Sequence, residues 1–333
     1  MPRQGRINIE GGIYHIIQRG LEKREIFLDD EDRREFLRRL KNGLEETGHK
    51  CYAWVLMPNH FHLLIRSGVK PSCDLMRKLS TGYALYFNKK HDRCGYLYQG
   101  RYKSVLCQEE SYFLQLIRYI HLNPLRAKIV KDLREFEIFL WSGHSVLLGI
   151  NHLKWQSTGE VLGRFGKSQL EAVKKYREFV LEAKDIGRRD ELSGGGLIRS
   201  AGGWEEVKSL RESKSRLKAD ERILGDGQFV DNALQHSERK MKRHEKFKKE
   251  GWNIKKLEAH VCKLTNIKEG VIIGKKKKSN IKAKGLLAYW GVNELGIKGA
   301  ELGRYLGISK QAISYLIKKG EKTANEDGLY LSI

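Results

Sequence analysis

Two apolar runs joined by a short turn constrain the fold of this chain most. Residues 51–56 and 60–65 are rich in β-branched and aromatic side chains, and MPN between them is a turn signal. Runs at this spacing predict an antiparallel hairpin. Residues two apart on a strand point to the same face, so His60 and His62 would present both imidazoles on one side. That arrangement is typical of metal ligands, although a strand histidine pair can also be only hydrogen-bonded neighbours.

The segments around the hairpin alternate between strand and helix patterns. Residues 12–19 and 105–108 have strand patterns, while residues 30–46, 72–90 and 110–122 repeat apolar side chains at helical spacing. In chain order this is β-α-β-β-α-β-α. It predicts an α+β fold in which helices pack on a ferredoxin-like, four-stranded antiparallel sheet.

The remainder of the chain has a mostly α-helical pattern that ends in a helix-turn-helix. We expect a first domain in residues 1–150, a highly charged helical connecting region in residues 151–250, and a helix-turn-helix domain in residues 251–333. Residues 193–203 (SGGGLIRSAGG) are typical of a flexible linker. A lysine run occupies residues 275–278.

Residues 299–320 predict the helix-turn-helix. A short helix leads to a glycine turn at Gly307, and Ser309 is positioned to cap the second helix. The alternative is a small helical bundle with a solvated basic face. The side chains expected to meet base edges and phosphates are Ser309, Lys310, Gln311, Ser314, Tyr315 and Lys318.

The charge balance points to a polyanionic partner. The chain has 64 Lys and Arg against 41 Asp and Glu, a formal charge of +23. No basic segment gathers Trp and Phe on one face, so nucleic acid is favoured over a membrane surface. No window approaches the roughly 18 apolar residues of a membrane span, and no secretory signal is evident, which predicts a cytoplasmic protein. Five cysteines without a CxxC pair argue against disulfides and against a cysteine zinc site.

The predicted helix of residues 110–122 contributes a second chemical group. Tyr119 and Asn123 are four residues apart and share a face, and Pro124 is expected to end the helix. If this face packs beside the hairpin, two imidazoles, an amide oxygen and a phenol could form one site. Such donors leave open positions on Mg²⁺ or Mn²⁺ for a phosphate oxygen. A phenol with an ordinary pKa of about 10 needs a nearby cation to become a nucleophile. The alternative is a core tyrosine and an asparagine that merely ends a helix.

Four segments together resemble the REP-associated tyrosine transposases, within the single-tyrosine HUH transposase superfamily. They are GIYHIIQRG, AWVLMPNHFHLLIR, YFNKKHDRCGYLYQGRYKS and SYFLQLIRYIHLNPLRAKIV, within about residues 5–148. The resemblance implies that His60 and His62 bind the metal, that Asn123 is the third ligand, and that Tyr119 forms a 5′-phosphotyrosine intermediate. It also implies single-stranded or hairpin DNA as the substrate, in a bacterial, nucleoid-associated setting.

Further residues are assigned alongside this resemblance. Arg101 and Lys103 are expected near the scissile strand, with Arg19 as a weaker candidate. Leu21 departs from the family, whose members often carry Asn there, and this affects a loop contact. The segment from Lys284 to Gly320 is similar to the DNA-binding domain of bacterial chromosomal replication initiators, which implies contact with double-stranded DNA.

Three functions follow as hypotheses. The first is a metal-dependent DNA endonuclease and strand transferase, that is, a transposase. The second is a non-catalytic, sequence-specific DNA-binding regulator, and the third is a hydrolase that uses a metal-bound water. Whether the protein is a monomer or a homodimer, and whether Tyr119 acts in cis or in trans, stays open at this point.

Overall fold

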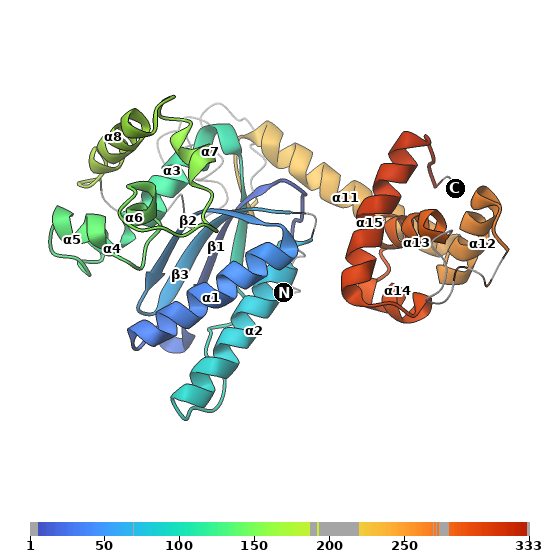
Figure 1. Cartoon of the computed structure of the whole chain (residues 1–333), viewed down its shortest axis with the longest axis horizontal. Coiled ribbons are helices and arrows are strands. Elements are labelled where there is room, and N and C mark those ends of the chain that lie inside the picture. The colour runs from blue at the N-terminus through green and yellow to red at the C-terminus, as the bar shows by residue number, and fades with distance from the viewer. Residues whose placement is uncertain are drawn as a thin grey trace, which may run out of the picture. The chain divides into compact units, whose positions relative to one another are not determined.

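The computed structural model describes residues 6–68, 70–186, 192, 220–268, 270, 272 and 280–331. The chain divides into two units, Met1–Leu234 and Gln235–Ile333 (Figure 1). The predicted linker of residues 193–203 and the lysine run of residues 275–278 lie outside the described residues. The three-domain division of the sequence stays a prediction.

A five-stranded sheet forms the centre of the first unit, in the order β2-β3-β1-β4-β5. The strands are β1 (Ile13–Arg19), β2 (Lys50–Met57), β3 (His60–Arg66), β4 (Lys103–Cys107) and β5 (Ile223–Leu224). The first four pair antiparallel, and β5 runs parallel to β4. The prediction of a four-stranded antiparallel sheet was therefore wrong in one respect, because β5 makes the sheet five-stranded and mixed. Two residues that pair with a strand over a hundred positions away leave no local pattern.

The described helices of the first unit range from 3 to 19 residues in length. They are η1 (Leu21–Lys23), α1 (Asp30–Thr47), α2 (Ser72–Lys90), α3 (Glu109–His121), α4 (Asn123–Arg126), α5 (Leu133–Ile138), α6 (His144–Leu147), α7 (Thr158–Leu162) and α8 (Gln169–Leu181). Helix α11 (Gly227–Lys249) spans the boundary between the units. Among the described residues, no helix has the length and apolar run that crossing a membrane requires.

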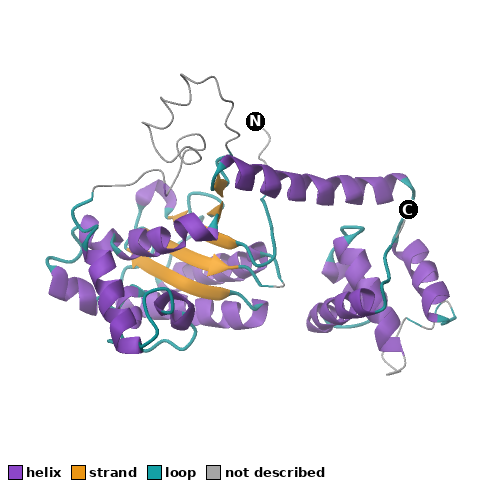
Figure 2. Ribbon diagram, turned by 90° about the horizontal axis from the view of Figure 1, so that it is seen from above, coloured by secondary structure: helices purple, strands orange, loops and turns teal. Residues whose placement is uncertain are grey.

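The sheet separates two apolar layers, and in Figure 2 its strands lie between helices. One layer joins Tyr14 and Ile16 of β1 to the apolar faces of α1 and α2. The other joins Ile13 of β1 and Leu64 of β3 to α3. Because side chains alternate along a strand, His60 and His62 share the α3 side of β3 with Leu64.

The chain after α3 differs from its prediction. The helix ends at His121, and a separate short helix, α4, begins at Asn123 with Pro124 in its first turn. Proline is tolerated there because the first helical N–H groups have no partner within the helix. Helix α3 thus ends before Pro124, as predicted, and the unpredicted feature is the new helical turn that contains Pro124 and separates Asn123 from the helix of Tyr119.

The second unit is a helical bundle with a core around Trp290 and Leu286. Its helices are α12 (Ile254–Thr265), α13 (Ile281–Asn293), α14 (Gly299–Leu306) and α15 (Lys310–Glu326). Helices α13 and α15 approach most closely at two glycines, since a Cβ atom on Gly320 would lie 2.0 Å from the carbonyl oxygen of Gly285. Only a residue without a side chain allows the two backbones this approach.

We predict that Gly320→Ala destabilises the second unit by about 1–3 kcal/mol, the usual cost of overpacking. The matched control is Gly299→Ala, where the new Cβ would meet Ile313 Cγ2 at an ordinary 3.5 Å. Hydrogen exchange of the α13 and α15 amides in the full chain measures the difference. Equal protection in the two variants would contradict the close approach of α13 and α15.

Candidate metal and tyrosine site

The histidine pair lies at the beginning of β3. The ring centroids of His60 and His62 are 5.1 Å apart. His60 is half-buried beside the β2–β3 turn, whereas His62 is 3% exposed. In the register of β3 with β1, His60 is opposite Arg19 and His62 is opposite Ile17. Both rings are thus on the α3 side of the sheet, at the end where β1 finishes.

Tyr119 faces this pair from α3, within the same chain. Its ring centroid is 6.0 Å from that of His62, and the two rings meet edge to face at 80°. The side chain is 7% exposed, and the guanidinium carbon of Arg126 lies 5.8 Å from the ring centroid. Strand β3 and helix α3 therefore bring an imidazole and a phenol together, and the Arg126 guanidinium lies close to the phenol ring.

Asn123, the predicted third ligand, is the first residue of α4, four residues after Tyr119. Its amide nitrogen donates to the carbonyl oxygens of Tyr119 at 2.8 Å and Ile120 at 3.2 Å. These bonds add side-chain donors to carbonyls in the last turn of α3. Since the nitrogen is held by the helix end, the amide oxygen is the atom of Asn123 that can bind a cation.

His15 is a third histidine at this position, and sequence reasoning missed it. It lies fully buried on β1, with its Nε2 2.9 Å from Nδ1 of His62 and the two rings stacked at 23°. Its ring centroid is also 6.0 Å from that of Tyr119. A histidine inside an apolar strand was the available signal, but its neighbours became known only with the strand order.

The surroundings keep His62 neutral. Burial, and then the nearby His15, His60 and Arg19, hold the pKa of His62 well below its ordinary value. A neutral imidazole is the form that binds a metal ion. Two imidazoles and an amide oxygen, all uncharged donors, therefore fit a divalent cation that retains open positions.

The predicted basic residues are at the edge of this site. Arg19 is exposed at the end of β1, across from His60. Lys103 begins β4, exposed, across from Ile17, and Arg101 is exposed two residues earlier. All three are thus available to solvent near one end of the sheet.

The residues predicted for the helix-turn-helix belong to the second unit. The backbone between α14 and α15 turns at Gly307, which has a φ of +64°, and the Ser309 hydroxyl accepts a hydrogen bond from the Ala312 N–H at 3.3 Å. Gln311, Tyr315 and Lys318 are exposed and Ser314 is half-buried. Lys310 begins α15, and its side chain lies outside the described residues.

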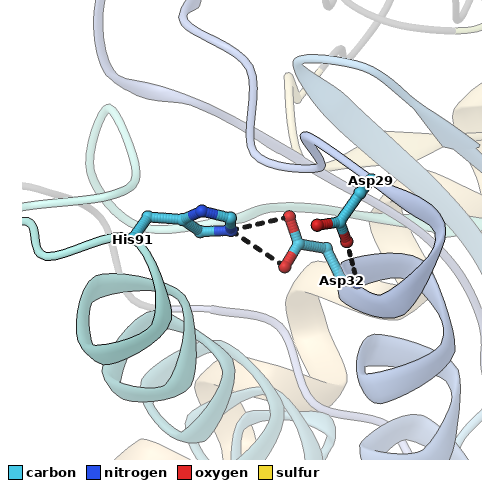
Figure 3. A group of neighbouring side chains, drawn as sticks. All are labelled: Asp29, Asp32 and His91. Carbon is cyan, nitrogen blue, oxygen red and sulfur yellow. Dashed lines mark hydrogen bonds and ion pairs between the residues drawn. The ribbon is translucent and has the colours of Figure 1, made fainter.

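A second group of possible ligands lies on the opposite face of the sheet. Asp29, Asp32 and His91 place ligand atoms within 4.8 Å of one another (Figure 3). The Lys90 ammonium is 2.8 Å from Asp29 and 3.1 Å from the fully buried Asp32, whose carboxylate also accepts the Leu28 N–H. Because a lysine already supplies the cation, we assign these groups to joining α1 and α2 and not to a metal.

The helix that carries Tyr119 is supported from behind by a buried polar cluster. Nδ1 of His121 and Nδ1 of His144 lie 2.8 Å and 2.7 Å from the Tyr176 hydroxyl of α8. His144 also stacks on Phe136 with 4.3 Å between ring centroids. These contacts hold α8 against α3 and thereby fix the position of Tyr119.

Comparison with known proteins identifies the domain. Residues 8–123 match the family described as IS200-like transposases. This segment begins before β1 and ends at Asn123, so it includes β1 to β4 and both faces of the sheet. No match was found among curated proteins.

Two solved structures are similar. One is a REP-associated tyrosine transposase bound to a REP hairpin, with 15% identity and a TM-score of 0.38, covering 47% of this chain and 98% of that one. The other is a candidate transposase of Deinococcus radiodurans R1, with 21% identity and a TM-score of 0.26, covering 35% of this chain and 95% of that one.

The family match defines the class of the first unit as a DNA transposase domain. More specifically, the matched segment is of the IS200-like type, which indicates an enzyme of the tyrosine transposase class. The prediction of a tyrosine transposase is confirmed at this level. The narrower resemblance to the REP-associated group stays a prediction.

The buried cluster behind α3 predicts a loss of stability in acid. Burial lowers the pKa of His144 to about 3, against about 6.5 in an unfolded chain. The unfolded state binds the proton first, so stability is complete above pH 6.5 and falls as the pH is lowered. At pH 5 the loss from His144 amounts to about 2 kcal/mol.

Urea unfolding of the full chain at pH 7 and pH 5 measures this loss. His144→Gln, which can still bond the Tyr176 hydroxyl, is expected to reduce the difference between the two pH values. Replacing the exposed His152 by Gln is the control and should leave it as it is. If His144→Gln retains the full difference, burial of His144 is not its cause.

Proposed function

We propose that this chain is a metal-dependent, single-stranded DNA endonuclease and strand transferase that acts through Tyr119. The observation that carries the proposal is the 6.0 Å separation of the Tyr119 and His62 rings, inside a segment that matches the IS200-like transposases. The helix and the strand belong to one chain. The proposal therefore assigns the tyrosine and the histidine pair of one active site to the same molecule.

We assign His60, His62 and Asn123 as the ligands of Mg²⁺ or Mn²⁺. When bound, the ion supplies positive charge to the scissile phosphate. The three residues offer only uncharged donors, and the neutrality of His62 keeps its lone pair available. Arg126 adds a protein cation 5.8 Å from the centre of the phenol ring.

Tyr119 is the nucleophile in this proposal. Its oxygen attacks the phosphorus, the bond from phosphorus to the 3′ oxygen breaks, and the phenol proton is lost to solvent while the leaving oxygen gains one. The products are a 5′-phosphotyrosine and a free 3′ hydroxyl. Because one phosphodiester replaces another, a second 3′ hydroxyl can reverse the exchange on another strand without ATP.

The substrate we propose is single-stranded or hairpin DNA at a repeat end. Arg19, Arg101 and Lys103 are exposed near the end of the sheet that bears His60. The formal charge of +23 favours the approach of a polyanion to the chain as a whole. These residues would hold the backbone of the strand and leave base recognition to other contacts.

We predict that Tyr119→Phe abolishes the covalent DNA adduct, since the variant lacks the attacking oxygen. The assay incubates the full chain with Mn²⁺ and a pool of labelled single-stranded hairpins that includes repeat-end sequences. Tyr112→Phe, on the same helix and half-buried, is the matched control and should form the adduct normally.

The same assay separates the alternative functions. A DNA-binding regulator would show no adduct in any variant and would keep its DNA affinity after Tyr119→Phe. A hydrolase that uses a metal-bound water would still cut DNA after Tyr119→Phe and lose cutting after His60→Ala. Either result would contradict a mechanism in which Tyr119 is the nucleophile.

We further propose that the second unit contacts double-stranded DNA through α15. The left-handed turn at Gly307 and the Ser309 cap support a helix-turn-helix arrangement of α14 and α15. The exposed side chains of α15 then offer an amide, a phenol and an ammonium in Gln311, Tyr315 and Lys318. Amides suit base edges and ammonium groups suit phosphates.

We predict that Lys318→Ala lowers duplex affinity and reduces the salt dependence of binding by about 0.9 in log–log slope, the value for one phosphate contact. Lys263→Ala on α12 removes the same charge from an exposed position and is the control. Fluorescence anisotropy with duplexes selected from a randomised library measures both. Identical slopes for the two variants would remove Lys318 from the interface.

A further inference from the structure

A line of buried hydrogen-bonding groups runs from His62 through His15 to Leu192. The first link joins Nδ1 of His62 to Nε2 of His15, at 2.9 Å. The second joins Nδ1 of His15 to the carbonyl oxygen of Leu192, at 3.2 Å. His15 is fully buried and Leu192 is 1% exposed, so water does not compete for these links.

The carbonyl oxygen sets the direction of every hydrogen in this line. A carbonyl only accepts, so Nδ1 of His15 must carry a hydrogen and donate it to Leu192. A neutral imidazole has one N–H, which leaves Nε2 of His15 as an acceptor. Nδ1 of His62 must then donate to His15, and the lone pair of His62 is on Nε2.

In His60 the imidazole hydrogen is likewise placed on Nδ1, but by different neighbours. Its Nδ1 lies 2.6 Å from Oδ1 of Asn59, and the Asn59 amide nitrogen donates to the Lys23 carbonyl at 3.1 Å. That second bond turns the amide oxygen towards His60, so Nδ1 of His60 donates and its Nε2 carries the lone pair. Both histidines of the pair therefore present the same nitrogen.

We propose that His15 is a positioning residue that holds His62 in the tautomer whose Nε2 binds the metal. This inference rests on the proposed function, in which His62 is a ligand. In water, an imidazole side chain favours the tautomer with hydrogen on Nε2, which cannot bind a metal through that atom. The hydrogen bonds from His62 to His15 and from His15 to Leu192 disfavour that competing tautomer already in the metal-free protein. Groups that orient a ligand in this way contribute about 10- to 100-fold in metal affinity.

The Leu192 contribution also extends the site beyond the recognised domain. The family match ends at residue 123, whereas the Leu192 carbonyl is 177 residues from His15 along the chain. The segment that follows the transposase domain thus takes part in arranging its histidine pair.

Two substitutions test the proposal. His15→Leu removes the acceptor for His62. His15→Gln keeps the line, because its amide oxygen can accept from His62 while its amide nitrogen donates to Leu192. Neither changes a proposed metal ligand or Tyr119.

The first readout is the tautomer of His62 in the metal-free full chain, from imidazole ¹⁵N chemical shifts assigned with His62→Gln. We expect the hydrogen on Nδ1 in the wild type and in His15→Gln, and on Nε2 in His15→Leu. The second is Mn²⁺ affinity by titration calorimetry, expected to weaken about 10- to 100-fold in His15→Leu and to recover in His15→Gln.

The outcomes separate this inference from the proposed function. An unchanged His62 tautomer in His15→Leu would overturn the positioning role, as would equal Mn²⁺ losses in the Leu and Gln variants. By contrast, wild-type protein that shows the expected tautomer and binds Mn²⁺, yet forms no Tyr119 adduct, would contradict the strand-transfer proposal and leave the role of His15 intact.

Discussion

The antiparallel pairing of β1 with β3 is the constraint on which the rest of the site depends. Its register places Arg19 opposite His60 and Ile17 opposite His62, so the next inward residue, His15, is diagonal to His62. Diagonal neighbours on one face are within reach of ring side chains. A shift of one residue would turn these side chains of β1 to the α1 and α2 layer and leave His62 without its partner. The same hydrogen bonds that build the core therefore set the chemistry of the histidine pair.

Burial of the pair has a second effect. Because α3 covers this face, His62 and Tyr119 are almost removed from water, at 3% and 7% exposure. Desolvation keeps the imidazole uncharged and makes a nearby positive charge more effective on a phenol than it would be in water. Packing of α8 through Tyr176 holds α3 in this position from the far side.

Local patterns predicted the parts of the site that lie close together in the sequence. The hairpin was predicted correctly because alternation and a turn signal set both strands, and this placed His60 and His62 on one face. The Tyr119 helix followed from its apolar spacing. The break between α3 and α4 was not predicted, because a proline is compatible both with the end of one helix and with the first turn of the next. Strand β5, His15 and the Leu192 carbonyl depend on contacts between distant segments, which no local pattern records.

The choice of uncharged donors distinguishes the histidine site from the carboxylate group on the other face of the sheet. Asp29 and Asp32 bring two negative charges, of which Lys90 offsets only one, so an added phosphate would be repelled there. Imidazoles and an amide leave the charge of a bound divalent ion undiminished, and a phosphodiester is an anion. The nearby protein charges are also positive, in Arg19 and Arg126. Arg19 is exposed, so salt limits its attraction for a phosphate to distances below about 8–10 Å. A neutral ligand set within a basic rim therefore suits the proposed phosphoryl transfer to a buried phenol.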